Sequence, residues 1–138
     1  MKEDIEIFSL IYVSQSLIVP QIIEQQIEEI VAWSRQRNAA LGITGCLVFT
    51  GKSFAQLLEG SRRHVEKVMA SIERDPRHEQ IQILEKAALG VRRCSDWSLG
   101  YFGPSLLVQR VIQRTLDQRS SMAALRDLTD LLVQFEGT

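Results

Sequence analysis

Four polar side chains occupy positions where the surrounding sequence pattern favours apolar ones. Ser34 and Asn38 lie one helical turn apart in an apolar stripe of helical spacing, and Gln56 lies in an apolar run of strand-like alternation. Tyr12 adds a phenol to another apolar run near the start of the chain. Burying such groups costs a few kcal/mol of folding free energy unless their donors and acceptors are paired. The four residues therefore either satisfy one another or face a polar ligand.

The chemistry of these side chains favours a planar heterocyclic ligand. The carboxamides of Asn38 and Gln56 each offer a donor and an acceptor, which suits a ring edge that alternates N–H and C=O groups. For any one of these residues a partner within the protein is the simpler interpretation, because buried polar groups in native proteins are usually paired. The convergence of all four on one cavity would instead indicate a bound ligand.

Strands are expected to carry two of the four residues. The run 7–13 is rich in β-forming residues, and its alternation places Tyr12 on one face of a strand. The runs 43–50 and 53–60 predict a hairpin, with Gln56 in its second strand. Further strands are predicted near 81–89 and 95–102.

Helices are expected to carry the other two. Pro20 suits the first turn of a helix and Gly42 ends it, so the stripe with Ser34 and Asn38 lies on a helix between them. Ser61 is a candidate N-cap for a second helix, which ends before the segment DPRH.

The order of these elements predicts an α+β fold. The succession β-α-β-β-α-β is typical of the ferredoxin-like plan, with both helices on one face of a sheet, and a fifth strand is added at its end. After residues 1–103, the segment 104–138 predicts an amphipathic helical hairpin within the same compact unit. The leucine stripe of its last helix either folds back onto the domain's own sheet or supports a homo-oligomer, most simply a homodimer.

Composition excludes several classes of function. Lys plus Arg (16) nearly balances Asp plus Glu (17), so no basic field is available for nucleic acid. No apolar stretch is long enough for a bilayer span, and the first residues do not form a signal peptide. Cys46 and Cys94 are far apart and predict two reduced thiols rather than a disulfide scaffold or a metal site. The chain is therefore expected to be cytoplasmic.

Five short segments together resemble the BLUF domain, a flavin-binding blue-light sensor of bacteria and some algae. They are LIYVSQS, SRQRNAALGITG, FAQLLEG, DPRH and SDWSLG, and they occur in order over roughly residues 6 to 102. Each segment alone is weak support, but all five at matching intervals are highly specific. The resemblance implies a non-covalent flavin, FAD with FMN as the alternative.

The resemblance also implies roles for individual residues. Gln56 resembles the switch glutamine between the flavin and a tyrosine, which Tyr12 matches. Asn38 resembles the residue that hydrogen-bonds the ring edge of the flavin. Trp97 matches a tryptophan on the last strand whose position near the flavin varies in the family, and it is taken with Tyr12 and Gln56 as the photoactive switch.

Further positions either match the family pattern or depart from it. Ser34 resembles a neighbour of the ring pocket, and Arg77 and His78 match positions near the polar parts of the flavin. Leu99 stands where the family commonly has a methionine implicated in passing the signal outward. Arg37 stands where relatives often carry Asn or His.

The expected function is a blue-light photoreceptor and not an enzyme. The resemblance implies that excited flavin transiently oxidises Tyr12 and that Gln56 then rearranges its hydrogen bonds. No output domain is expected, so the signal would pass to a separate signalling protein. An acylphosphatase-like hydrolase would need an Arg in the first loop, and the segment SQSLIVPQ has none; an RNA-recognition module would need basic and aromatic residues that SFAQLLEG does not show. A flavin-free interaction domain of the same fold stays open.

Overall fold

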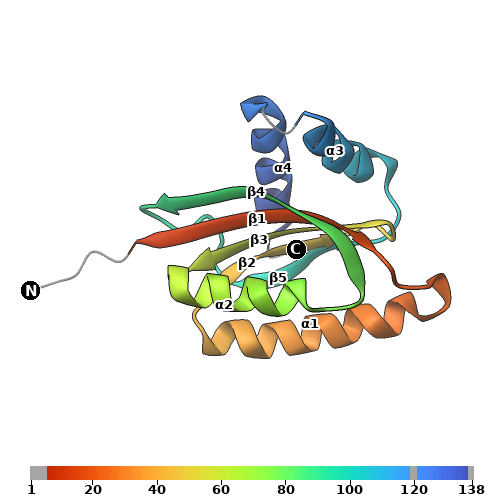
Figure 1. Cartoon of the computed structure of the whole chain (residues 1–138), viewed down its shortest axis with the longest axis horizontal. Coiled ribbons are helices and arrows are strands. Elements are labelled where there is room, and N and C mark those ends of the chain that lie inside the picture. The colour runs from red at the N-terminus through yellow and green to blue at the C-terminus, as the bar shows by residue number, and fades with distance from the viewer. Residues whose placement is uncertain (1–5, 119–120, 137–138) are drawn as a thin grey trace, which may run out of the picture.

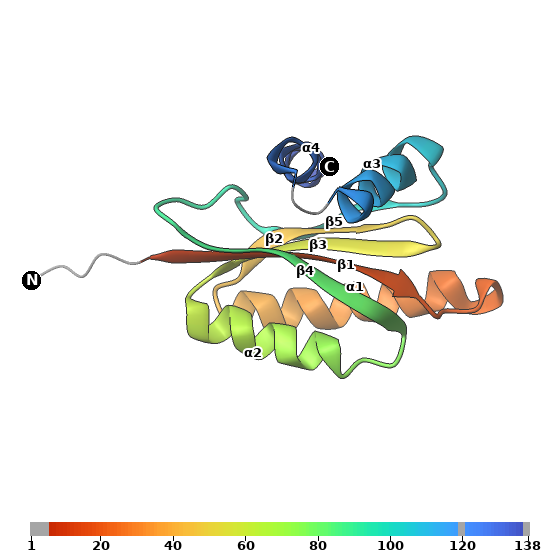
Figure 2. The ribbon, with the colours of Figure 1, turned by 45° about the horizontal axis from the view of Figure 1, so that its top comes forward.

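The computed structural model describes residues 6–118 and 121–136, which form a five-stranded sheet covered by helices on both faces (Figures 1 and 2). The elements in chain order are β1 (Ile7–Ser16), a short 3-10 helix (Pro20–Ile22), α1 (Ile23–Ala40), β2 (Thr44–Phe49), β3 (Ser53–Gly60), α2 (Arg62–Glu73), β4 (His78–Leu89), β5 (Trp97–Phe102), α3 (Leu106–Asp117) and α4 (Met122–Phe135). Helices α1 and α2 lie below the sheet in Figure 1, and α3 and α4 lie above it.

The strand order in the sheet is β4-β1-β3-β2-β5. β1 pairs antiparallel with both β3 and β4, β2 pairs antiparallel with β3, and β5 joins the edge parallel to β2. The α+β, ferredoxin-like arrangement with an added fifth strand, predicted from the order of elements, is confirmed. The two helices of that plan lie on one face, and the C-terminal pair covers the other.

Strand β1 divides the core into two layers. Because successive side chains on a strand point to opposite faces, Leu10 and Tyr12 pack toward α1 and α2, while Ile11 and Val13 pack toward α3 and α4. All four are buried. A strand covered on both faces needs apolar residues at nearly every position, and this explains the apolar run over residues 7–13, which only Ser9 interrupts.

Two polar side chains of helix α1 point toward the protein interior. Its buried residues are Ile27, Ser34 and Asn38, as the stripe predicted. Pro20 lies in the short 3-10 helix that precedes α1 rather than in α1 itself. The chain leaves α1 through Gly42, whose φ of 66° suits a residue without a side chain.

Helix α2 begins where the sequence predicts. The Ser61 hydroxyl accepts a hydrogen bond from the backbone N–H of His64 and so caps the helix. After this helix, β4 begins three residues earlier than expected, since His78 pairs with Ser16 at the end of β1. His78 is therefore part of the sheet.

The C-terminal helices pack on the sheet through an apolar seam. Ile112 of α3 and Leu128 and Leu132 of α4 are fully buried in the layer that also contains Ile11 and Val13. The leucine stripe of the last helix thus folds back onto the domain's own sheet, one of the two alternatives, and a homo-oligomer stays a prediction. Among the described residues no helix is both long and apolar enough to cross a bilayer.

Candidate functional site

A chain of hydrogen bonds links three buried side chains from three strands. Gln56 of β3 donates from Nε2 to the Tyr12 hydroxyl of β1 over 2.6 Å. Trp97 of β5 donates from Nε1 to Gln56 Oε1 over 3.0 Å. The register places Tyr12 directly opposite Gln56, which is why these two side chains meet on the same face of the sheet. The three are at most 4% exposed, so water does not compete for these bonds.

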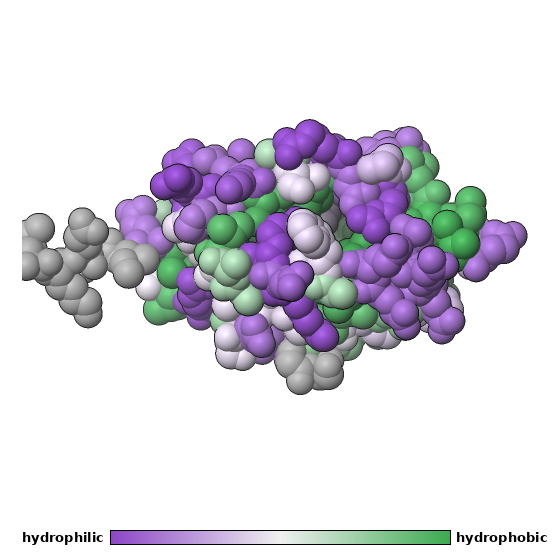
Figure 3. Space-filling view, turned by 90° about the horizontal axis from the view of Figure 1, so that it is seen from below, coloured by the Kyte–Doolittle hydropathy of each residue, from purple (hydrophilic) through white to green (hydrophobic). Residues whose placement is uncertain are grey.

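The Tyr12 and Gln56 side chains lie at a cavity of about 610 Å³ between the sheet and helices α1 and α2 (Figure 3). Tyr12 and Gln56 line it from the sheet, Ser34 and Arg37 line it from α1, and the segment after α2 closes it. The complete lining is Tyr12, Gln26, Ile30, Trp33, Ser34, Arg37, Leu47, Phe54, Gln56, Ser71, Ile72, Arg74, Asp75, Pro76, Arg77 and His78. The volume lies within the roughly 300–1,000 Å³ typical of cofactor and small-molecule sites.

Asn38 carries a donor that the protein does not satisfy. Its side chain is fully buried, and its Nδ2 group has no hydrogen-bond partner among the described residues. Its Oδ1 accepts a hydrogen bond from Arg37 Nε over 3.1 Å. Asn38 does not line the cavity itself and lies behind Arg37, which does. Because an unpaired buried amide is costly, this donor indicates an acceptor that a ligand supplies.

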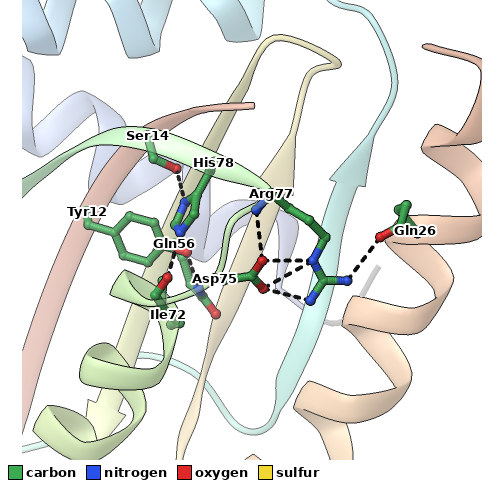
Figure 4. A network of polar contacts seen from close by, with 8 residues as sticks. All are labelled: Tyr12, Ser14, Gln26, Gln56, Ile72, Asp75, Arg77 and His78. Atoms are coloured by element: carbon green, nitrogen blue, oxygen red, sulfur yellow. Dashed lines mark hydrogen bonds and ion pairs between the residues drawn. The ribbon is translucent and has the colours of Figure 1, made fainter. Parts of the chain in front are cut away.

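Arg77 and His78, which follow α2 in the chain, form another part of the cavity wall (Figure 4). Arg77 makes an ion pair with Asp75, with Nη2 and Oδ2 2.7 Å apart, and donates from Nη1 to Gln26 over 3.4 Å. Burial alone would raise the pKa of Asp75, but the hydrogen bonds and charge of Arg77 outweigh it and hold that pKa below its ordinary value. Asp75 is therefore a charged anchor for Arg77.

His78 is fixed at both ring nitrogens. Nδ1 lies 2.7 Å from the Ser14 hydroxyl, and Nε2 lies 2.7 Å from the backbone carbonyl of Ile72. Since a carbonyl only accepts, Nε2 carries a proton, and in the neutral ring Ser14 donates to Nδ1. The ring stands edge-on to Tyr12 with centroids 6.2 Å apart. His78 therefore positions the phenol and the cavity wall and has no nitrogen left for a ligand.

The electrostatics of the site keep the phenol neutral. Burial raises the pKa of Tyr12 well above its ordinary value, although the Gln56 hydrogen bond and Arg37 act in the opposite direction. Burial also disfavours the charged form of Arg37 and so lowers the pKa of its guanidinium. A buried, protonated phenol beside a cavity can give up an electron and then a proton, and burial resists any earlier loss of that proton to water.

Two carboxylates hold the segment that leads into Trp97. Glu59 at the end of β3 is fully buried and accepts hydrogen bonds from the backbone N–H groups of Arg93 and Cys94, over 2.9 and 2.7 Å. Glu136, just after α4, accepts from the backbone and hydroxyl of Ser95, over 2.8 and 2.7 Å. The position of Trp97 therefore depends on both β3 and the end of α4.

The structure brings most of the predicted site residues to one place. Tyr12, Ser34, Gln56, Arg77 and His78 all line the cavity. The remaining two lie behind this wall: Trp97 contacts Gln56, and Asn38 contacts Arg37.

Sequence reasoning missed much of the cavity wall, including Gln26, Trp33 and Asp75. Asp75 belongs to the segment DPRH, where the adjacent Arg77 was a signal for an acidic partner. Trp33 offered a different signal, as a large aromatic residue outside the apolar stripe of its helix. Gln26 offered none, because a glutamine outside the apolar stripe of a helix is ordinary.

Comparisons with known proteins agree with this geometry. The family model described as "BLUF: Sensors of blue-light using FAD" matches residues 7–100. The blue light- and temperature-regulated antirepressor BluF of Escherichia coli (strain K12) is 42% identical over 57 residues, which is 41% of this chain and 14% of that protein. The photoactivated adenylate cyclase subunit beta of Euglena gracilis is 29% identical over 90 residues, which is 65% of this chain and 10% of that protein.

These curated relatives are much longer, so the match spans only a small part of each. The solved dark-state structure of BlrB, a BLUF protein, has a similar length: the likeness covers 96% of both chains with a TM-score of 0.70 and 27% identity. The likeness of fold therefore extends over nearly the whole length of both chains.

Proposed function

The chain belongs to the BLUF family of blue-light sensors that bind flavin, and we propose that Tyr12, Gln56 and Trp97 form the light-driven switch of a photoreceptor carrying FAD. A BLUF domain senses light and is not itself catalytic. The observation that carries the proposal is the Gln56 amide, which is shared between a phenol and an indole at the wall of a cofactor-sized cavity.

The donors and acceptors around the cavity fit a flavin. The unpaired Nδ2 of Asn38 supplies a donor for a carbonyl of the ring, and the Gln56 amide supplies a second polar contact. Ile30, Leu47 and Phe54 give the cavity apolar walls for the flat faces of the ring. Arg77 is anchored by Asp75 and would meet the polar parts of the cofactor. The binding is non-covalent in this proposal.

Flavin excited by blue light supplies an oxidant strong enough to take an electron from a nearby phenol. Tyr12 is buried and protonated, so it gives an electron, then a proton, and recovers both when the charge returns. Gln56 leaves this cycle in a new state, either rotated or in another tautomer. Nothing is consumed, and the lasting product is a different set of hydrogen bonds.

Rotation of the Gln56 amide has a defined cost in this site. The indole N–H of Trp97 can only donate, so it bonds to Oε1 but not to Nε2. A half-turn that exchanges the two ends of the amide therefore breaks the Trp97 bond while it offers the phenol an acceptor. The two orientations are distinct states, and light shifts the population from one to the other.

The output is proposed to run through β5 and the C-terminal helices to a separate signalling protein in the cytoplasm. Trp97 begins β5, and Glu136 after α4 holds the backbone just before it. A change at the indole therefore has a short route to α4. A homodimer or higher oligomer would add a second surface for the same signal.

Cofactor content tests the proposal directly. The full chain expressed with ample riboflavin should be yellow and release one flavin per chain on denaturation, and chromatography of the released flavin should show FAD rather than FMN. Blue light should then shift the absorption reversibly to the red. A colourless protein that binds no added FAD would instead support a flavin-free interaction domain of the same fold.

A further inference from the structure

A buried carboxylate lies at the end of β3, on the face of the sheet that α3 and α4 cover (Figure 1). Side chains on a strand alternate between the two faces, so Glu59 shares its face with Leu57, which packs in the layer of Ile112 and Leu132. Gln56 points to the opposite face, where it lines the cavity. Glu59 is 0% exposed, and a carboxylate is stable at such a depth only where donors surround it.

Within the described part of the chain, every hydrogen-bond partner of this carboxylate is a donor. The backbone N–H groups of Arg93 and Cys94 donate to Oε2 and Oε1, over 2.9 and 2.7 Å, and the Thr44 hydroxyl donates to Oε1 over 2.8 Å. Arg92 donates to the Thr44 oxygen over 2.7 Å, so the hydroxyl proton is directed at Glu59. The carboxylate therefore makes charge-assisted bonds to the backbone between β4 and β5, and such bonds are stronger than those between neutral groups.

The backbone that Glu59 holds leads directly to the indole of Trp97. Cys94 precedes Trp97 by three residues, and Glu59 follows Gln56 by three residues on β3. Strand β3 therefore holds the segment 94–97 at both ends, through Glu59 on one face of the sheet and through Gln56 on the other. Because β2 lies between β3 and β5, strand pairing alone does not make these two contacts. A displacement of Cys94 would move the indole relative to the amide.

The second carboxylate at this segment holds it less firmly. Glu136 accepts hydrogen bonds from Ser95 and from the backbone N–H of Asp96, but these bonds are exposed. Water competes for exposed hydrogen bonds, so their net contribution is smaller than that of buried ones. The buried Glu59 is therefore the stronger of the two anchors.

We propose that Glu59 is a positioning residue of the switch. From the face opposite to the cavity, it holds the backbone before β5 so that the Trp97 indole stays in hydrogen-bond contact with Gln56. The inference rests on the proposed function, since the role of Gln56 as the switch belongs to that function. Glu59 acts on the amide only through Trp97. With its contacts intact the amide has one orientation in the dark, and without them it has two.

Glu59→Gln tests this with almost no change in side-chain volume. A carboxamide has one oxygen and one NH₂ group, so it cannot accept from the backbone N–H groups of Arg93 and Cys94 at its two ends. The indole proton of Trp97 should then exchange with solvent about tenfold faster in the dark, as expected for the loss of one buried hydrogen bond. NMR of the full chain labelled with ¹⁵N-tryptophan measures this, because the sequence has two tryptophans and Trp97→Phe identifies the second signal.

The light-induced red shift gives a second readout. In Glu59→Gln it should fall toward about half of the parent value, which is the value for two equally populated orientations of the amide. The same substitution should cause no further fall in Trp97→Phe, where the indole that it positions is absent. Thr44→Val removes the hydroxyl that orients the carboxylate and should move both readouts in the same direction by a smaller factor. It keeps the test decisive if Glu59→Gln does not fold.

Glu85→Gln is the matched control. Glu85 accepts from the Ser9 hydroxyl over 2.8 Å and pairs with Arg93, with Nη2 and Oε2 2.7 Å apart. It thus belongs to the same polar cluster at the same end of the sheet, but among the described residues its carboxylate bonds side chains and not the backbone before β5. Its loss should leave the indole exchange and the red shift at their parent values.

The outcomes separate the inference from the proposed function. If Glu59→Gln leaves both readouts unchanged, or lowers the red shift as much in Trp97→Phe as in the parent, the inference is overturned while the photoreceptor stands. If Glu85→Gln has the same effects as Glu59→Gln, they reflect a general loss of stability, and the inference is again overturned. If the parent binds no flavin, the proposed function fails. The indole exchange, which needs no flavin, then still decides whether Glu59 positions Trp97.

Discussion

Trp97 Nε1 donates a hydrogen bond to Gln56 Oε1 over 3.0 Å. Because an indole N–H cannot accept, this one contact orients the whole amide, and its Nε2 end must face the Tyr12 hydroxyl. The phenol oxygen therefore acts as an acceptor in this state. Trp97 on the edge strand β5 thus fixes the orientation of the Gln56 amide, which lies between β1 and β3.

Removing the indole donor should weaken this choice of orientation. Trp97→Phe keeps an aromatic ring in the core but leaves Gln56 Oε1 buried without a partner, so the free energy of unfolding should fall by about 1–3 kcal/mol. The amide should then populate both orientations in the dark, and the light-induced red shift should become smaller. Urea unfolding and light-minus-dark absorption measure the two effects. An unchanged red shift would show that Trp97 does not orient Gln56.

Asn38 should matter for binding more than for folding. Asn38→Ala removes a donor that has no partner within the described chain, so flavin affinity should fall by about 1–3 kcal/mol, roughly fivefold to 150-fold in Kd. The free energy of unfolding of the flavin-free protein should change by less. Equilibrium titration with FAD gives the first quantity and urea unfolding the second. Gln25→Ala, an exposed amide on the same helix away from the cavity, serves as the control. Equal FAD affinity in Asn38→Ala and the parent would place Asn38 outside the flavin site.

Leu99 should limit how far the signal travels rather than whether it forms. It lies two residues after Trp97 on the same face of β5. It packs against the core between the sheet and α1, near Ile27 and Val31. Leu and Met have similar volumes, but Met is unbranched and adapts more readily to two arrangements. Leu99→Met should leave the absorption spectra nearly unchanged and enlarge light-dependent hydrogen-exchange differences in residues 95 to 135. Equal exchange differences would mean that this position does not limit the relay.

Alkaline pH should destabilise the fold through its two buried thiols. Burial raises the pKa of both Cys46 and Cys94 from 9.0 to about 12. Above about pH 9 the unfolded chain loses these protons while the folded chain keeps them, so the free energy of unfolding falls as pH rises. The slope should be at most about 1.4 kcal/mol per pH unit for each thiol.

Urea unfolding at several values between pH 7 and pH 10 measures this slope. The double variant Cys46→Ala and Cys94→Ala should give a flatter dependence over the same range, whatever its stability at pH 7. A parent protein with constant stability from pH 8 to pH 10 would contradict the assignment of raised thiol pKa values.

Local patterns were sufficient to predict most of the fold. The alternation in β1 and the Ser61 cap depend on neighbours in sequence, and both are observed. The surface on which α4 packs could not be predicted this way, because a leucine stripe can pack on a second copy of the chain as well as on the domain's own sheet. In the structure the end of α4 packs directly on β5 at Gly100, where a side chain would collide with Cys46 Sγ and Phe135.

The site was predictable only where a residue type was unusual for its position. Tyr12, Asn38 and Gln56 are polar residues in apolar patterns. Tyr12 and Gln56 line the cavity, and Asn38 lies behind Arg37 in its wall. The resemblance pointed to Trp97, but its contact with Gln56 depends on β5 lying beside β2, which periodicity does not reveal. Arg74 in the cavity wall was missed because exposed side chains leave no mark on a burial pattern.

The light-minus-dark absorption spectrum of the flavin-loaded chain, compared with that of Tyr12→Phe, tests the central claim most directly. Tyr12→Phe removes the phenolic hydroxyl and keeps the ring, so both proteins should hold flavin. Blue light should give a small, reversible red shift in the parent and none in the variant. A flavin-loaded parent that shows no shift, or a Tyr12→Phe variant that shows the full reversible shift, would contradict the account.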